Sequence, residues 1–297
     1  MAVNIIDGKQ LAEKIKADVR KQVDELAADG VKLKLAAVMV GEPPASMVYA
    51  RSQAKHCENM GISYELVQLP ADSNQIQIAQ RIEQLNTDPD ITGIMLHLPL
   101  PEGIDTPAVQ YCINPFKDVE GVNPVNIGMV FYGEPIIAPC TALAAVETIR
   151  STGMELRGTE AVVVGQSPVV GLPISVFLIQ NFATVTACHI ATVDLQAHTR
   201  KADLLIVAVG KAGLITADHV KPGAVIIDVG INRIKTTDAD GNTVSKTVGD
   251  VDFDAVSKVA SAITPVPGGV GPVTVAILLR NTVEAARKQL TATKKGK

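Results

Sequence analysis

The chain opens with an alternation of helical and extended patterns. Apolar residues recur every three or four positions over 8–28, which predicts a helix, and the mostly apolar run 34–40 predicts a buried strand. The alternation continues with predicted helices at 46–60 and 76–85 and predicted strands at 64–69 and 93–98. A regular exchange of helix and strand is typical of an α/β domain.

Residues 99–139 interrupt this pattern. They are rich in Pro, Gly and Asn, with only a short helix predicted at 107–113, which indicates a linker or a cleft-forming loop. After a helix at 142–152, a second series predicts a helix at 169–181 and strands at 161–164, 184–188, 203–209 and 224–229. This order predicts a Rossmann-like, doubly wound fold.

The length of the chain favours two domains. At 297 residues it is about twice the common domain size of roughly 150 residues. We expect an N-terminal α/β domain at 1–139 together with 273–297, and a Rossmann-like domain at 140–272. The final helix, predicted at 275–290, is expected to return to the first domain.

Composition excludes several classes of protein. A net charge of −4 and the lack of a basic, aromatic-interleaved stripe argue against nucleic acid as a partner. No apolar run reaches the roughly 18 residues of a membrane span, and the start shows no secretory pattern. The four cysteines lie far apart in the sequence, at Cys57, Cys112, Cys140 and Cys188. This spacing predicts neither a metal site nor a disulfide framework, so we expect a reduced, cytoplasmic protein.

A glycine-containing turn follows the strand predicted at 161–164. Gly165 permits a tight turn, and the following helix start can bind a pyrophosphate through its backbone N–H groups. The spacing departs from G-x-G-x-x-G, because Ser167 and Val170 replace the second and third glycines. A turn that needs glycine only for its geometry is an equally good interpretation of the motif alone. Neither an acid nor an arginine ends the next strand, near Ile190, so the choice between NAD and NADP stays open.

Eight separated segments resemble the methylenetetrahydrofolate dehydrogenase/cyclohydrolase family, and together they cover essentially the whole chain. They are Ile-Asp-Gly-Lys at 6–9, Pro-Ala-Ser-x-x-Tyr at 44–49, Leu-Pro-Leu-Pro at 98–101, Lys-Asp-Val-x-Gly at 117–121, Pro-Cys-Thr at 139–141, Gly-x-Ser at 165–167, Asp-Val-Gly-Ile-Asn at 228–232 and Thr-Pro-Val-Pro-Gly-Gly-Val-Gly-Pro at 264–272. The last is the most specific.

The resemblance implies a folate-binding cleft between the domains and two successive reactions in one-carbon metabolism. These are NAD(P)-dependent oxidation of 5,10-methylenetetrahydrofolate and hydrolysis of the methenyl product to 10-formyltetrahydrofolate. It also implies a homodimer. The implied substrate-binding residues are Tyr49, which stacks on the folate, with Asp118, Glu120, Pro265, Pro267, Gly268 and Gly269. The implied cofactor-binding residues are Gly165, Gln166, Ser167, Ile190 and Ile231.

The chain departs from the family pattern where the reaction takes place. The family has a catalytic Lys four residues after the Tyr, and here that position is Gln53. Lys55, two positions further, points about 200° away around the helix and is a poor substitute. His97 replaces a Gln, and Glu120 replaces an Asp. The Arg common in NADP-preferring members is Gln166 here, which suggests that NAD use is possible.

These departures bear unequally on the two reactions. Hydride transfer depends on how the folate and the nicotinamide are positioned and needs no proton transfer by the protein, so a chain with Gln53 can still catalyse this step. Hydrolysis requires general acid/base chemistry, and an amide does not titrate. Three hypotheses follow: a dehydrogenase with reduced or absent cyclohydrolase activity, which we prefer; a bifunctional enzyme in which His97 and Glu120 compensate; or a catalytically silent folate- or nucleotide-binding paralogue. For His97, we favour a packed, structural histidine over a proton carrier. The candidate catalytic residues are Tyr49, Gln53, His97 and Glu120.

Overall fold

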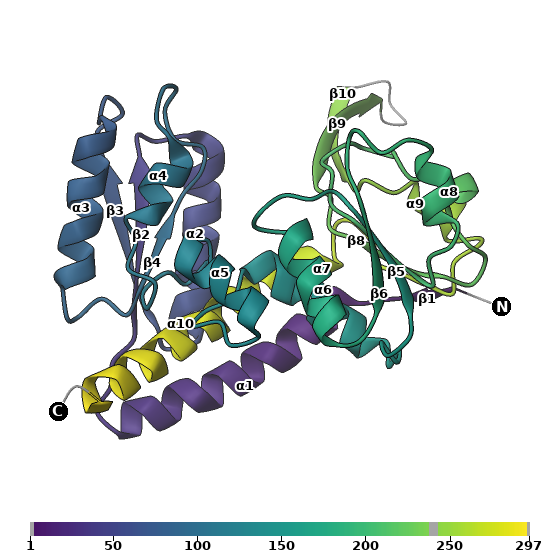
Figure 1. Cartoon of the computed structure of the whole chain (residues 1–297). Coiled ribbons are helices and arrows are strands. Elements are labelled where there is room, and N and C mark those ends of the chain that lie inside the picture. Colours follow the sequence, from purple (N-terminus) through teal and green to yellow (C-terminus); the bar gives the residue numbers. More distant parts are fainter. Residues whose placement is uncertain (1–2, 238–242, 296–297) are drawn as a thin grey trace. The chain divides into compact units, whose positions relative to one another are not determined.

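The computed structural model describes residues 3–237 and 243–295. They form two compact units, each with its own parallel sheet (Figure 1). The three-stranded unit comprises residues 14–140 and 275–295, and the six-stranded unit comprises residues 3–13, 141–237 and 243–274. The predicted α/β class with a Rossmann-like domain is confirmed, whereas the exact domain limits remain a prediction.

The three-stranded unit has the strand order β3-β2-β4, with all pairs parallel. Its strands are β2 (Lys34–Val40), β3 (Ser63–Leu69) and β4 (Gly93–Leu96). Its helices are α2 (Pro44–Asn59), α3 (Gln75–Thr87), α4 (Thr106–Tyr111) and α5 (Pro124–Tyr132), with most of α1 (Gly8–Ala28) and α10 (Val270–Lys295). The central strand β2 is buried along almost its whole length, which explains its continuous apolar sequence.

Local sequence signals explain where several helices begin. The Asn74 side chain accepts from the backbone N–H of Gln77, whose side chain accepts from the Asn74 backbone, so α3 starts with a capping box. Helix α2 begins with Pro44 at its first position, where a missing N–H is tolerated. The buried face of α3 forms one core with the strands, which includes Val38, Ile82 and Ile94.

The C-terminal helix packs within the three-stranded unit, as the sequence predicted. Asn281 of α10 donates to the carbonyl oxygens of Val119 at 2.9 Å and Ala138 at 3.0 Å. Arg287 donates to the side chain of Gln22 in α1 at 2.8 Å, and the two helices lie side by side (Figure 1). A residue of α10 therefore supplies hydrogen bonds to carbonyl groups that precede it by more than 140 residues.

The six-stranded unit has the parallel order β1-β11-β8-β7-β5-β6. Its strands are β1 (Asn4–Ile5), β5 (Glu160–Val164), β6 (Thr184–Cys188), β7 (Leu204–Val207), β8 (Val225–Asp228) and β11 (Ala262–Ile263). A separate antiparallel hairpin consists of β9 (Asn232–Thr237) and β10 (Thr243–Val248). The helical segments are α6 (Cys140–Ser151), α7 (Gly171–Gln180), α8 (Leu195–Thr199), η1 (Ala217–His219) and α9 (Phe253–Val256).

The strand order reverses between β5 and β7. The chain leaves β5 for β6 on one side and then crosses to β7 on the other. In open parallel sheets, ligands bind outside the carboxyl ends of the strands at such a reversal. The ends of β5, β6 and β7 are therefore the expected place for a dinucleotide.

The structure contains several elements that the sequence analysis did not predict. Residues 99–139 contain a second helix, α5, which Asn123 caps and Gly133 ends in the left-handed conformation. Strand β1 was not predicted; it pairs with β11 and so places residues 3–13 in the six-stranded unit. The hairpin β9–β10 was also missed. Within residues 3–237 and 243–295, no helix is both long and apolar enough to cross a membrane.

Candidate active site

Helix α2 carries two of the predicted catalytic residues on one face. Tyr49 is 45% exposed, so a flat ligand can stack on its ring. Gln53, one helical turn further on, is only 2% exposed, and neither its amide oxygen nor its amide nitrogen has a hydrogen-bond partner in the described chain. Lys55 is exposed, as its helical phase predicted, so it does not replace the family's lysine. A buried amide without partners is unusual and marks a position where a ligand is expected to supply them.

His97 directly follows β4 and is 4% exposed. Its Nε2 lies 3.2 Å from the hydroxyl oxygen of Tyr64 in β3, and its ring meets the Tyr49 ring edge to face, with centroids 6.0 Å apart and planes at 88°. Burial lowers the pKa of His97, which favours the neutral imidazole at pH 7. This is the packed, hydrogen-bonded histidine that the sequence analysis favoured, while a catalytic role for it remains a prediction.

Glu120 presents its carboxyl group to the same cluster. The residue keeps some exposure, but its carboxyl group is enclosed, and Oε2 accepts from the backbone N–H of Leu96 at 3.1 Å. Burial raises the pKa of Glu120 to about 7; the Leu96 hydrogen bond opposes this rise, and the nearby Asp118 adds to it. Burial, followed by the charge of Glu120, also raises the pKa of Tyr49. The Gln53 side chain opposes this rise in the pKa of Tyr49, although neither of its amide atoms forms a hydrogen bond in the described chain.

The raised pKa of Glu120 makes the stability of the protein depend on pH. The folded state holds this proton up to about pH 7, whereas an unfolded glutamate loses it near 4.5, so stability falls as pH rises between these values. In a Glu120→Gln variant we expect this fall to be smaller by about 1 to 3 kcal/mol. Urea unfolding of both proteins at pH 5 and pH 8 measures the difference; equal pH dependence would show that Glu120 titrates normally.

Asp118 lies inside the protein rather than at a binding surface. It is 0% exposed, and its carboxylate accepts from the backbone N–H groups of Gly121 at 3.1 Å and Asn123 at 2.7 Å and from the Asn126 side chain at 2.9 Å. Burial raises its pKa, and these hydrogen bonds oppose the rise. Its predicted role in folate binding stays a prediction, but the geometry supports a role in holding the turn that carries Glu120.

A cavity of ≈ 540 Å³ lies at the carboxyl ends of β5, β6 and β7. Three predicted cofactor residues, Gly165, Gln166 and Ile190, line it. Ser167 is exposed in the same turn, and Ile231 is exposed after β8. The sequence analysis did not name two polar lining residues, His189 and Lys211. His189 directly follows β6, and Lys211 lies shortly after β7. Because the strand order reverses beside these strand ends, their place in the sequence could have identified both as residues of the cofactor site.

The backbone around this cavity fits a dinucleotide. Gly165 has a φ of +100°, and a Cβ there would lie 2.0 Å from the carbonyl oxygen of Ala208. A Cβ on Gly171, at the start of α7, would lie 1.8 Å from the carbonyl oxygen of Gly165. Both positions therefore require glycine, and they bring the strand end and the helix start together as pyrophosphate binding requires. Gln166 and Ser167 would border the phosphates in this turn.

The polar residues that line the cavity bear on the choice between NAD and NADP. The Gln166 amide nitrogen donates to the carbonyl oxygen of Val163 at 2.9 Å, so it is not free for a 2′-phosphate. Among the described residues that line the cavity, none carries a carboxylate, and Lys211 supplies a positive charge. A carboxylate is typical of NAD sites and a cation of NADP sites.

The remaining predicted folate-binding residues lie in the six-stranded unit, in the loop that leads into α10: Pro265, Pro267, Gly268 and Gly269. A buried pair of aspartates lies at the base of this loop. Asp228 accepts from the backbone N–H groups of Gly230, Asp250 and Val251, and Asp250 accepts from those of Val209 and Gly210. Burial raises the pKa of Asp228 to about 6. The sequence analysis included Asp228 in a family motif but did not predict its pairing with Asp250, and this pair holds the strand ends in place.

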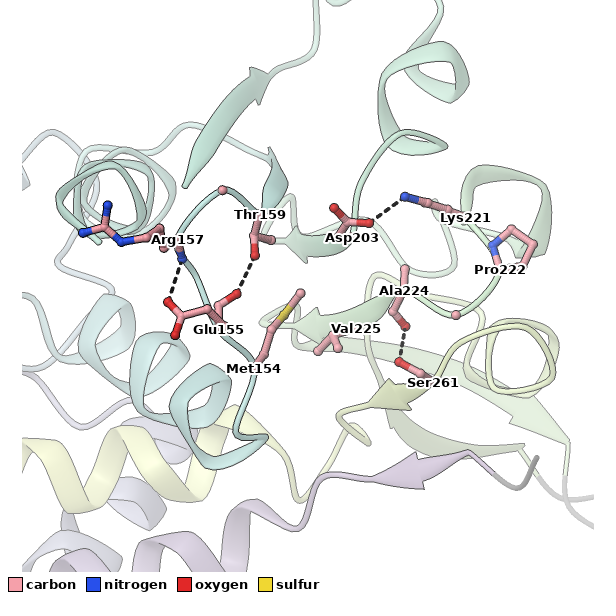
Figure 2. Close-up of a pocket in the computed structure, with 12 residues that line it drawn as sticks. Met154, Glu155, Arg157, Thr159, Asp203, Lys221, Pro222, Ala224, Val225 and Ser261 are labelled. Carbon is pink, nitrogen blue, oxygen red and sulfur yellow. Dashed lines mark hydrogen bonds and ion pairs between the residues drawn. The ribbon is translucent and has the colours of Figure 1, made fainter. Parts of the chain in front are cut away.

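A second hollow, of ≈ 490 Å³, lies at the opposite edge of the same sheet, at the amino ends of β5, β7 and β8 (Figure 2). Its charged groups already have partners: Lys221 donates to Asp203 at 2.6 Å, and the Glu155 carboxylate accepts from the backbone of Arg157 at 3.0 Å. Since dinucleotides bind at carboxyl ends, this hollow is not the cofactor site.

These features define a class of protein. A Rossmann-like unit with a glycine-lined cavity, together with a separate α/β unit carrying a tyrosine, amide and carboxyl cluster, is typical of a two-domain dinucleotide-dependent enzyme. Two family models match the chain. They are "Tetrahydrofolate dehydrogenase/cyclohydrolase, catalytic domain" over residues 6–120 and "Tetrahydrofolate dehydrogenase/cyclohydrolase, NAD(P)-binding domain" over residues 139–290. The chain belongs to the tetrahydrofolate dehydrogenase/cyclohydrolase family.

Similar proteins agree over the full length. The chain is 48% identical to "Bifunctional protein FolD" of Brevibacillus brevis, over 97% of this chain and 99% of the relative. The solved structure of the Campylobacter jejuni bifunctional FolD is 41% identical, with a TM-score of 0.90, covering 97% of this chain and 100% of that one. The Trypanosoma brucei enzyme, solved with NADP and an inhibitor, is 35% identical with a TM-score of 0.90, over 98% and 99% of the two chains.

Proposed function

We propose that the chain is an NAD(P)-dependent methylenetetrahydrofolate dehydrogenase of one-carbon folate metabolism, in which the family's cyclohydrolase activity is reduced or absent. The observation that carries this proposal is Gln53. It is buried one helical turn from the exposed Tyr49, its amide has no hydrogen-bond partner among the described residues, and it cannot titrate. Family membership supports the dehydrogenase, and the loss of a titrating group supports the reduced hydrolase.

The dehydrogenase step requires little of the protein beyond placement. A hydride leaves the methylene carbon for the nicotinamide, and the lone pair of the neighbouring folate nitrogen forms the new C=N bond. No proton moves, so the chain must hold the folate in register and exclude water. Tyr49 is proposed to stack on the folate, Glu120 and the loop residues Pro265, Pro267, Gly268 and Gly269 are proposed to bind it, and Asp118 is proposed to hold the turn that carries Glu120.

The hydrolysis step requires proton transfers. Water adds to the methenyl carbon and loses a proton, and one folate nitrogen gains a proton as its bond to that carbon breaks. A titrating side chain in contact with the folate speeds such transfers by about 10²- to 10⁴-fold. Gln53 supplies none, whereas Glu120, with its pKa raised by burial to about 7, is the group that would sustain residual hydrolysis.

A paired assay on one purified sample tests the proposal. Methylenetetrahydrofolate oxidation is followed with NAD and with NADP, and methenyltetrahydrofolate loss is compared with its spontaneous rate. Oxidation with hydrolysis near the spontaneous rate is expected. Rapid hydrolysis would instead assign the proton transfers to Glu120 or His97, and the absence of both activities would favour a silent folate- or nucleotide-binding paralogue.

We also propose a cytoplasmic homodimer. Strand β6 is an edge of the six-stranded sheet, and apolar side chains beside it are exposed: Leu172, Ile179 and Phe182. Leu172 and Ile179 are seven residues apart on α7 and so share one face. The four free cysteines support a reducing compartment. Sedimentation of the parent chain as a dimer, and of an Ile179→Glu variant as a monomer, is expected; a monomeric parent contradicts the proposal.

A further inference from the structure

The ring of Tyr49 is only partly held by the protein. It stands 45% exposed on α2, and its ring contact in the described structure is the edge-to-face packing against His97, with centroids 6.0 Å apart. A half-exposed side chain has rotamers to lose when it binds a ligand, and that loss weakens binding unless a neighbour holds the ring beforehand. The orientation of the His97 ring therefore matters for Tyr49.

The His97 ring is fixed from two directions. Its backbone N–H donates to the carbonyl oxygen of Val38 in β2 at 2.8 Å, which sets where the residue leaves the sheet. Its Nε2 lies 3.2 Å from the hydroxyl oxygen of Tyr64, which sets the rotation of the ring. Without that hydroxyl, the second torsion of an imidazole is broad and the ring can turn away from Tyr49.

Tyr64 is anchored in the parallel sheet of the three-stranded unit. It belongs to β3 and pairs with Leu35 of β2, the buried central strand. Burial raises its pKa, so its hydroxyl keeps its proton throughout the neutral range and either donates to or accepts from the neutral imidazole. A line of contacts thus runs from the sheet through Tyr64 and His97 to the exposed ring of Tyr49.

We propose that Tyr64 is a positioning residue for folate binding: its hydroxyl fixes the His97 imidazole, and the imidazole holds the Tyr49 ring in the orientation that stacks on the folate. The inference rests on the proposed function, in which Tyr49 contacts the folate. It also gives His97 a positioning role rather than a proton-transfer role, because Nε2 is engaged by Tyr64.

Removing the Tyr64 hydroxyl should weaken folate binding without changing the chemistry. In a Tyr64→Phe variant we expect the KM for methylenetetrahydrofolate to rise about 3- to 10-fold, with kcat and the KM for the nucleotide close to the parent values. In a His97→Ala background the same change should have no further effect, since the hydroxyl then has no ring to orient. The matched control is Tyr111→Phe, an exposed tyrosine in α4, which should leave every parameter unchanged.

A measurement without substrate separates this inference from the proposed function. The chain has four tyrosines and no tryptophan, so ¹³C-labelled tyrosine rings can be followed by NMR and assigned with single Tyr→Phe variants. The Tyr49 ring resonances should shift in the same direction in Tyr64→Phe and His97→Ala, and no further in the double variant. Unmoved Tyr49 resonances in Tyr64→Phe, or independent additive shifts, would overturn the inference even if the enzyme oxidises folate. An inactive parent showing the coupled shifts would refute only the proposed function.

Discussion

A Gln53→Lys variant is expected to hydrolyse methenyltetrahydrofolate at least about 100-fold faster than the parent chain, while its dehydrogenase rate changes far less. The substitution puts a titrating amine on the face of α2 that carries Tyr49, at a position that is 2% exposed. Burial disfavours the charged amine and so brings its pKa toward the range useful for proton transfer near pH 7. The loss of methenyltetrahydrofolate above the spontaneous rate measures the effect.

Two further variants show whether the amine itself is responsible. Gln53→Met keeps an unbranched side chain of similar length without a titrating group, so it should hydrolyse no faster than the parent. Lys55→Gln removes an exposed amine two residues away and should change neither activity. A Gln53→Lys protein that hydrolyses no faster than Gln53→Met would show that the missing lysine does not explain the reduced hydrolysis.

A Gly171→Ala variant is expected to bind either nucleotide at least about tenfold more weakly and to be less stable by about 1 to 3 kcal/mol. The new methyl carbon would lie 1.8 Å from the carbonyl oxygen of Gly165, so the start of α7 must move away from the turn after β5. That movement removes the backbone N–H groups from the pyrophosphate position. Titration calorimetry with NADH and NADPH, together with urea unfolding, measures both effects.

Gly128→Ala is the matched control. Gly128 lies inside α5, and apart from its chain neighbours and the backbone of the helix itself, no described atom lies within 4 Å of the Cβ that alanine would add. Alanine is the better helix former, so this variant should be more stable by about 0.5 to 1 kcal/mol and should bind nucleotide as the parent does. Unchanged nucleotide binding in Gly171→Ala would contradict the assignment of this turn to the pyrophosphate.

Local periodicity predicted most of the regular elements. The helix expected over 8–28 is α1, and the strand expected over 34–40 is β2, because each has an apolar face or run that its own residues define. Strand β1 was missed because its two residues gain their conformation only from pairing with β11. Helix α5 was missed because Pro, Gly and Asn suggested a loop, although Asn123 and Gly133 are the residues that begin and end it.

The sequence predicted which residues of the candidate site share a helical face, but not which side chains from different strands contact one another. The four-residue spacing of Tyr49 and Gln53 placed both on one helical face, and the exposure of Lys55 agrees with that phase. The partnership of Tyr64 with His97 was not predictable, because Tyr64 lies in β3 and His97 follows β4, two strands that pair with β2 and not with each other, and local sequence patterns do not reveal a side-chain contact across a central strand. The burial of Asp118 likewise depends on hydrogen bonds that motif resemblance does not reveal.

The return of α10 to the three-stranded unit has a consequence for the order of folding during synthesis. The carbonyl oxygens of Val119 and Ala138 accept hydrogen bonds from the side chain of Asn281, which leaves the ribosome more than a hundred residues later. Strand β1 likewise has no partner until β11, more than 250 residues later, has been made. Neither unit can complete its hydrogen bonding before residues 262–281 have been made, so we expect both to reach protease resistance only after these residues have left the ribosome.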